Sequence, residues 1–219
     1  MTHTQPEQQT APENTKYELL TTDTVKSWDG RTLYRIRALV AIAAIGVAAG
    51  DLGGYVEAEN NLHISGNAWV SGNAWVSGDA RVYGNARVSG DARVSGDAQV
   101  YGDARVLGNA RVSGDARVYG NARVSGDARV YGNARVSLDI HFGWMSHVGS
   151  ENGTLTWYRA TDGIQVNRGC FHGTLDEFES AVSKTHGDNQ SAKEYRCLID
   201  FIKLRSSSWV NEEAEQEAA

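Results

Sequence analysis

Twelve uninterrupted hexapeptides constrain the fold of this chain more than any other feature of its sequence. They run from Ser65 to Val136 and read SGNAWV, SGNAWV, SGDARV, YGNARV, SGDARV, SGDAQV, YGDARV, LGNARV, SGDARV, YGNARV, SGDARV and YGNARV. A unit of six residues cannot bury an apolar face by itself, so neighbouring units must stack into a solenoid.

Each hexad predicts a short strand with a fixed inner and outer side. Ala and Val stand two positions apart, so on an extended backbone both point to the same side. The Arg, Trp or Gln between them points the other way, as does the Ser, Tyr or Leu that follows Val. Gly with Asp or Asn then turns the corner, because Gly and Asn tolerate a positive φ. The interior is therefore filled by small apolar side chains alone.

The hexads resemble those of the left-handed parallel β-helix, in which three hexads form one triangular coil. The resemblance implies the left hand, which the usual crossover preference does not favour. It also implies that the twelve hexads form four coils, stacked about 4.8 Å apart. Val56, Ala58, Leu62 and Ile64 keep the inward spacing before the first hexad, which predicts a fifth, imperfect coil beginning near Asp51.

The flanking segments narrow the resemblance. GDLGGYVEAENNL (50–62) before the repeat, and VGSENGTLTWYR (148–159) and NRGCFHGTLDEF (167–178) after it, resemble YdcK-like hexapeptide-repeat proteins. The resemblance extends over roughly residues 17 to 205. Many such proteins are carried by bacteriophages and prophages, so it implies a phage-linked context. It implies no particular reaction.

The fold expected is mainly β, with five regions. Residues 1–15 contain no large apolar residue and are expected to form a disordered tail. Residues 16–50 are a β cap on the open end of the solenoid, 51–137 the β-helix, and 138–205 a small α+β domain. Residues 206–219 form a solvated acidic tail.

Local patterns predict the elements of the two flanking regions. In the cap, Tyr17–Leu20 and Thr32–Leu39 are expected strands, with a turn at Asp29-Gly30. In the C-terminal domain, Thr154–Ala160 and Ile164–Phe171 flank the turn signal Asp162-Gly163. Thr174 and Glu177 form a capping box for a helix that ends at Gly187, and Ser191 begins a second helix.

Charge and composition favour a cytoplasmic protein that does not bind nucleic acid. The repeat holds 9 Arg and 6 Asp, so it carries +3, whereas the whole chain carries −6. Nucleic-acid-binding proteins are usually basic. Cys170 and Cys197 are too few for a disulfide framework, which indicates a reducing compartment. The chain opens without a secretory-signal pattern, and its longest apolar run, Ala38 to Ala49, is shorter than a membrane span.

No catalytic, cofactor or metal site is expected. Hexapeptide acyltransferases resemble one another in having an inserted loop and a histidine base, but the twelve hexads have neither, and the nearest histidine, His63, is expected to face solvent. The absence of histidine from the hexads also excludes the three-histidine zinc site of carbonic anhydrases of this fold. Cys170 with His172, and Asp139 with His141 and His147, are more simply read as packing or turn residues.

The outer surface offers the candidate interaction residues. Positions 18 apart stack into columns, which places Tyr83, Tyr101 and Tyr119 in one column beside Arg81, Arg117 and Arg135. Corner aspartates are expected to balance the arginines in an ionic lattice. The irregular C-terminal domain adds Trp144, Trp157, Arg168 and His172 and is expected to carry specificity.

We therefore expect a non-enzymatic interaction scaffold with a protein partner, in phage context a host protein such as a defence component. An acyltransferase-like enzyme with a site between subunits, or a virion component, is the alternative. Resemblance to other hexapeptide-repeat proteins implies a homotrimer, with the tyrosine column at or near the contact. Aromatic and arginine side chains are enriched at protein interfaces.

Overall fold

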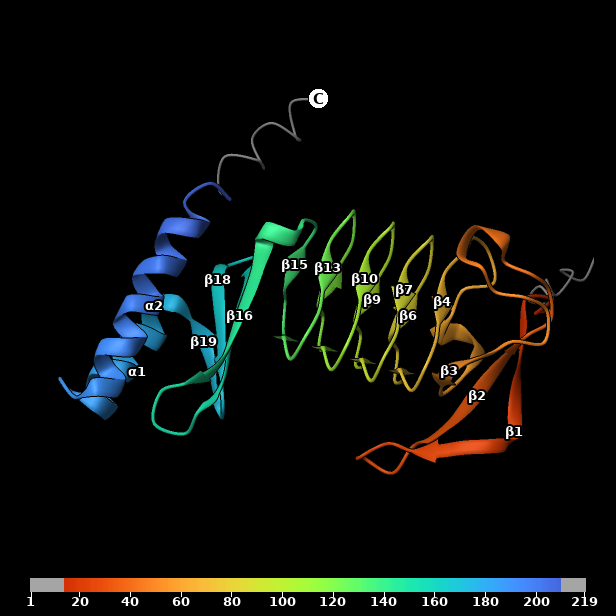
Figure 1. Ribbon diagram of the computed structural model, residues 1–219, viewed down its shortest axis with the longest axis horizontal. Helices are drawn as coiled ribbons and strands as arrows, with labels where there is room; N and C mark the ends of the chain where they lie inside the picture. The colour runs from red at the N-terminus through yellow and green to blue at the C-terminus, as the bar shows by residue number, and fades with distance from the viewer. Residues whose placement is uncertain (1–13, 210–219) are drawn as a thin grey trace, which may run out of the picture.

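The computed structural model describes residues 14–209, and within them a parallel β-solenoid lies between an N-terminal hairpin and a C-terminal α+β domain (Figure 1). Most of the tail expected over residues 1–15, and most of that over residues 206–219, lies outside the described residues. None of the helices in the described range is long and apolar enough to cross a bilayer.

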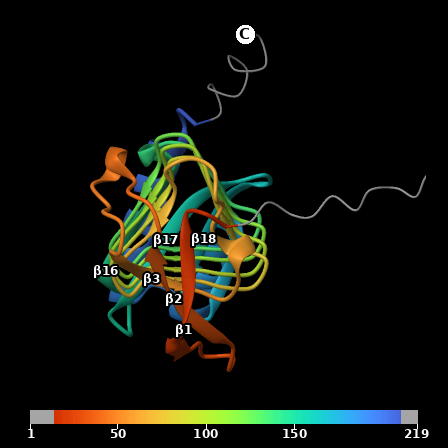
Figure 2. The same ribbon diagram turned by 90° about the vertical axis from the view of Figure 1, so that its right-hand side faces the viewer.

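The solenoid has three faces, made of two-residue strands except for the five-residue β3. Face 1 consists of β4 (Trp69–Val70), β7 (Arg87–Val88), β10 (Arg105–Val106) and β13 (Arg123–Val124). Face 2 consists of β3 (Leu52–Val56), β5 (Trp75–Val76), β8 (Arg93–Val94), β11 (Arg111–Val112) and β14 (Arg129–Val130). Face 3 consists of β6 (Arg81–Val82), β9 (Gln99–Val100), β12 (Arg117–Val118) and β15 (Arg135–Val136). Seen along the axis, the coils superpose into one closed outline (Figure 2).

The expected inside and outside are confirmed. Every Ala and Val of the twelve hexads is 0% exposed, and together they form one continuous core. Each hexad glycine has φ between 61° and 75°, so glycine alone supplies the left-handed residue of the corner, and the following Asn or Asp does not. The imperfect fifth coil is also present, because β3 joins face 2 and Leu62 bridges Val82 on face 3.

The hydrogen-bond direction makes the two ends of the solenoid chemically different. Each coil donates its N–H groups to carbonyls of the next coil, as in Arg87 N–H to Ala104 O at 2.9 Å and Arg105 N–H to Ala122 O at 2.8 Å. Open carbonyls are therefore left at the N-terminal end, and open N–H groups at the C-terminal end. Buried backbone groups of either kind need partners.

Donor side chains from the hairpin satisfy the N-terminal carbonyls. The Lys16 ammonium donates to Ala68 O at 2.7 Å and to His63 O at 3.1 Å. The Tyr17 hydroxyl contacts Leu62 O at 2.7 Å and Glu59 O at 2.9 Å. Burial lowers the pKa of Lys16 to about 8.

The hairpin is the expected cap, although its first strand is longer than predicted. β1 (Tyr17–Lys26) pairs antiparallel with β2 (Thr32–Ala38), which pairs antiparallel with β3, so the hairpin continues face 2. Ile36 and Ala38 enter the solenoid core, while Arg35 and Arg37 lie on the other side. The predicted first strand, Tyr17–Leu20, ends where a register irregularity occurs, and pairing resumes at Thr24.

Acceptor side chains satisfy the C-terminal N–H groups. Asp139 Oδ1 accepts from Arg123 N–H at 2.6 Å, and Thr156 Oγ1 accepts from Arg129 N–H at 3.1 Å. Asp139 belongs to the short helix η3 (Asp139–His141) that follows the last coil. The two ends of the solenoid are thus capped by groups of opposite hydrogen-bonding character.

The C-terminal domain is a four-stranded antiparallel sheet with two helices on one side. The sheet order is β16 (Phe142–Val148), β17 (Gly153–Ala160), β18 (Gly163–Arg168) and β19 (Phe171–Thr174), followed by α1 (Leu175–His186) and α2 (Gln190–Ser206). Phe142 and Tyr158 face the solenoid core, whereas Leu155 and Trp157 face the helices. The sheet therefore joins the solenoid to the helices.

Three details differ from the sequence expectation. β16 was not expected as a strand. The predicted strand Ile164–Phe171 is two strands, because Gly169 has φ 60° and the chain turns there. The second helix begins at Gln190, one residue before the expected Ser191. The capping box of Thr174 and Glu177 is confirmed, and α1 ends with Gly187 as its C-cap.

Candidate interaction site

The tyrosine column is a stack of parallel rings on face 3. The centroids of Tyr83 and Tyr101 are 4.8 Å apart with an interplanar angle of 3°, and those of Tyr101 and Tyr119 are 5.2 Å apart at 7°. All three side chains are half-buried by one another and by the neighbouring column. Burial raises the pKa of Tyr83 and of Tyr101 above the ordinary value for tyrosine.

The arginines expected beside this column do not form one uniform surface. Arg81 and Arg117 are exposed, but the Arg135 guanidinium is half-buried and donates to Ala134 O, Asn133 O and Asp115 O at 2.9–3.1 Å. Arg159 of β17, which the sequence analysis did not single out, lies at the Tyr119 end of the tyrosine column. Its Nε donates to Arg135 O at 3.0 Å and its Nη2 reaches Ser137 Oγ at 3.1 Å.

The expected ionic lattice is wrong. Within residues 14–209, no arginine of the hexads forms an ion pair with a corner aspartate. Instead, three aspartates accept hydrogen bonds from asparagines one coil earlier: Asn73 to Asp91 at 3.2 Å, Asn85 to Asp103 at 3.1 Å and Asn109 to Asp127 at 3.0 Å. The Gly-Asp and Gly-Asn corners of one coil therefore stack on the corners of the next coil, and the arginines at the strand centres stack on arginines.

The four C-terminal candidates fall into two groups. Trp157 is 4% exposed and Arg168 is 9% exposed, so both are wrong as surface contact residues. Arg168 Nη2 donates to Val148 O at 2.9 Å inside the domain. Trp144 and His172 are exposed, but each also contacts the solenoid: the Trp144 ring packs against Gly126, and the His172 ring lies next to Gly132. Within the domain, His172 Nε2 lies 3.1 Å from Tyr158 Oη.

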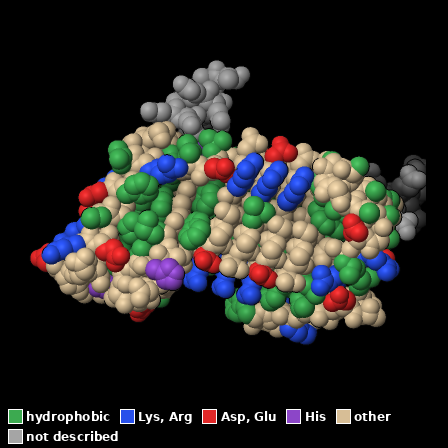
Figure 3. Space-filling view, in the orientation of Figure 1, with side chains coloured by type: hydrophobic (Ala, Val, Ile, Leu, Met, Phe, Trp, Pro, Cys, Tyr) green, Lys and Arg blue, Asp and Glu red, His purple; other side chains and the backbone are tan. Residues whose placement is uncertain are grey.

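An apolar surface that the sequence analysis missed lies on α2 and β16. It consists of Met145, Cys197, Phe201 and Leu204, which we call the α2 patch; the last two are 45% and 75% exposed. The patch borders a groove of about 480 Å³ lined by Met145, Val148, Lys193, Leu198 and Phe201, among others. Figure 3 shows apolar side chains gathered over this part of the molecule. The spacing Cys197, Phe201, Leu204 was a readable signal, because residues three and four apart share a helix face.

Most of the residues weighed for catalysis or metal binding take part in structural contacts. Cys170 lies in the turn between β18 and β19, and the His172 ring is hydrogen-bonded to the Tyr158 hydroxyl. Asp139 caps Arg123, and His141, 1% exposed, accepts from Ser137 and Leu138 N–H through Nδ1. Exposed His63 accepts the N–H of Ser65. Across the described residues, no three metal-binding side chains cluster.

Comparison with known families identifies the repeat. Five segments match one family in succession: residues 63–78, 80–96, 98–114, 116–130 and 128–141. That family is the YdcK β-solenoid repeat. The matched segments lie within residues 63–141, from the first hexads through η3, and do not include β3, the hairpin, or the C-terminal sheet and helices. No curated protein matches the chain.

Proposed function

We propose that this protein is a non-enzymatic interaction scaffold in which a rigid YdcK-type solenoid holds a partner-binding C-terminal domain. The α2 patch carries the proposal. Large side chains such as Phe201 and Leu204 are rarely left exposed side by side unless they contact another molecule. The groove beside them is lined chiefly by apolar side chains, with Lys193 and Glu194 at its rim.

The repeat supports this division of roles, in which the solenoid supplies a rigid support and the C-terminal domain binds the partner. Its hexads place nearly the same side chains outward on every coil, so they encode a shape and little that distinguishes one partner from another. The C-terminal domain shares the solenoid core through Phe142 and Tyr158, and Thr156 bonds the last coil. The α2 patch is therefore held at a fixed position on a stiff support, which lowers the entropy lost on binding.

The partner we propose is a protein with an apolar anchor that fits this groove. The resemblance to phage-carried and prophage-carried proteins points to a host protein, including a component of host defence, in the host cytoplasm. This part of the proposal rests on the family resemblance, and a fold alone does not define a partner.

The test uses two exposed residues of the patch and one matched control. Wild-type protein, the double variant Met145→Glu and Leu204→Glu, and the control Trp28→Ser are each used to capture proteins from host cells. Trp28 is 86% exposed, lies in the turn between β1 and β2, and does not line the groove beside the α2 patch. A partner captured by the wild type is then purified and titrated against all three by calorimetry.

We expect the double variant to bind this partner at least tenfold more weakly and the control to bind it unchanged. Loss of a well-packed apolar anchor commonly costs more than 1 kcal/mol of binding free energy. Equal affinity of all three proteins would refute the α2 patch as the site. Circular dichroism melts of the variants separate loss of binding from loss of folding.

A further inference from the structure

The arginine column of face 1 is an unbalanced line of positive charge. Arg87, Arg105 and Arg123 pair in register on parallel strands, so their side chains leave the backbone about 4.8 Å apart. Like charges at this spacing repel one another, and more strongly near a protein surface than in bulk water. Among the described residues, no carboxylate lies within ion-pair distance of any of the three.

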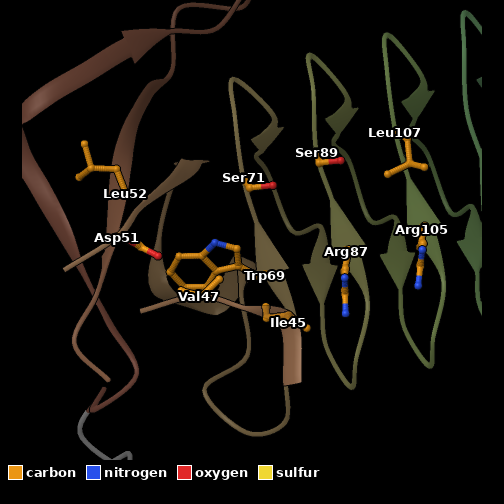
Figure 4. Close-up of a pocket in the computed structure, with 10 residues that line it drawn as sticks. All are labelled: Ile45, Val47, Asp51, Leu52, Trp69, Ser71, Arg87, Ser89, Arg105 and Leu107. Atoms are coloured by element: carbon orange, nitrogen blue, oxygen red, sulfur yellow. The ribbon is translucent and has the colours of Figure 1, made fainter. Parts of the chain in front are cut away.

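Arg87 and Arg105 line a groove with one apolar end (Figure 4), and Arg123 continues the column beyond it. Ile45, Val47 and Leu52 stand at that end, next to Trp69, and Leu107 lies beside the arginines. The groove encloses about 420 Å³. Its only acidic lining residue is Asp51, whose carboxylate already accepts the N–H of Ala48 at 2.7 Å. Figure 3 shows a row of Lys or Arg side chains on one face of the solenoid.

We propose that the acidic C-terminal segment of the same chain, Asn211–Ala219, docks along this arginine column. The segment reads NEEAEQEAA and contains four glutamates, Glu212, Glu213, Glu215 and Glu217, with no lysine, arginine or histidine. Arginine is well suited to this contact, because its planar guanidinium binds a carboxylate through two parallel hydrogen bonds. Four carboxylates are enough to neutralise three arginines.

The point at which the described chain ends makes the contact reachable. Trp209 is 3% exposed and packs edge-on against His141 of η3, with ring centroids 5.9 Å apart. The same short helix supplies Asp139, which accepts the N–H of Arg123 at 2.6 Å. The chain therefore leaves the described structure close to the C-terminal end of the column.

The length and spacing of the segment fit the column. Ten residues after Trp209 span up to about 33–36 Å when extended, whereas two coil spacings cover about 10 Å. Glu213, Glu215 and Glu217 stand at every second position, so carboxylates recur along the segment as arginines recur along the column.

Docking of this segment gives face 1 a regulated state. The segment covers the arginines, and any other anion that binds face 1 must first displace it. An intramolecular ligand of this kind acts at a high effective concentration, so weak individual ion pairs suffice to hold it.

The test compares two full-length proteins with a synthetic peptide of residues 210–219 as the probe. One protein is the wild type, and in the other all four glutamates are changed to Gln. The Nε–Hε resonances of the arginines are followed by NMR during titration. We expect the peptide to shift the Arg87, Arg105 and Arg123 signals of the Gln variant and to bind it at least fivefold more tightly than the wild type, where the resident segment competes.

Two further variants, built on the Gln protein, locate the site. Arg105→Gln with Arg123→Gln should abolish peptide binding, whereas the matched pair Arg93→Gln with Arg111→Gln on face 2 should retain it. Gln is a safe replacement, since the repeat itself has Gln99 at an equivalent position. Salt at 0.5 M should remove the difference between the two proteins.

Three results overturn the proposal. They are equal peptide affinity for the wild type and the Gln variant, no binding to either, or equal loss from the two arginine pairs. A difference between wild type and Gln variant that vanishes on dilution assigns the contact to a second copy of the chain and overturns the intramolecular form.

Discussion

At the residue scale, the hexad glycine is defined by its backbone and by the coil next to it. Gly102 has φ +68°, and a Cβ added there would lie 3.0 Å from the nitrogen of Gly120. Gly30, at the hairpin turn, has φ +84° and open space around it. An alanine at either position must adopt a left-handed backbone, but only at Gly102 would its Cβ also crowd the next coil.

We predict that Gly102→Ala lowers the free energy of unfolding by about 2–5 kcal/mol and Gly30→Ala by about 1–2 kcal/mol. A left-handed backbone costs an L-residue about 1–2 kcal/mol, and crowding in a packed stack adds about 1–3 kcal/mol. Urea denaturation of both variants measures the difference. Equal losses would show that the corners do not stack as tightly as the distances indicate.

Lys16 is a second residue whose environment gives a measurable effect. Burial lowers its pKa from 10.5 to about 8, so between pH 8 and 10.5 the unfolded chain binds more protons than the folded chain. Stability then rises with pH across this window. The carbonyls of Ala68 and His63, which accept from its ammonium group, oppose part of the shift.

We predict that the stability of the wild type relative to Lys16→Met increases between pH 8 and pH 10. Methionine keeps the length of the side chain and removes its titration. Urea denaturation of both proteins at pH 7, 8, 9 and 10 follows the difference. A difference that stays constant or falls with pH would contradict a lowered pKa at Lys16.

At the scale of elements, a two-residue strand is held by its neighbours in the stack. The tyrosine column shows this most clearly, because Tyr101 contacts a parallel ring on each side. Tyr131 occupies the equivalent outward position on face 2, in a column whose other members are Ser77, Ser95 and Ser113. It has no ring stacked on it among the described tyrosines, so it serves as a matched control.

We predict that Tyr101→Ser destabilises the solenoid by about 1–3 kcal/mol more than Tyr131→Ser does. Each stacked aromatic pair contributes about 0.5–1.5 kcal/mol beyond its buried area. Thermal unfolding of the two variants tests the difference. If Tyr131→Ser lowers the stability as much as Tyr101→Ser does, then ring stacking does not stabilise the tyrosine column.

At the scale of the whole molecule, the two flanking units complete the solenoid. Phe142 and Tyr158 cover the last coil, and Asp139 and Thr156 accept its free N–H groups. A chain that ends at Ser137 loses all four and exposes an unpaired strand edge at each face. Such edges pair with other chains.

We predict that the chain truncated after Ser137 forms large, polydisperse assemblies. Size-exclusion chromatography with light scattering distinguishes these from a single species. A monodisperse truncated chain would show that the last coil needs no cap. Point variants of the α2 patch are for this reason the cleaner test of partner binding.

Self-association through the tyrosine column is the remaining prediction at this scale. The column is the most apolar strip of face 3, and the resemblance to other hexapeptide-repeat proteins implies a trimer. Replacing Tyr83, Tyr101 and Tyr119 together with Ser should lower the molar mass toward the 23.7 kDa of one chain. An unchanged oligomer would exclude this face, and a wild type that already runs at 23.7 kDa would exclude the oligomer.

The sequence alone determined the solenoid, since its period of six allows one arrangement of inside, outside and corner. Interior Ala and Val, corner glycine and the fifth coil all followed from that local pattern. What the sequence did not determine depends on contacts between distant segments. Trp157 and Arg168 look like surface residues until the sheet and helices meet, and Lys16 becomes a cap only when it reaches carbonyls some fifty residues away. The spacing of 18 predicted the arginine columns, but only the tertiary structure showed that the corner aspartates do not balance their charge, because the corners stack on one another instead of reaching the strand centres.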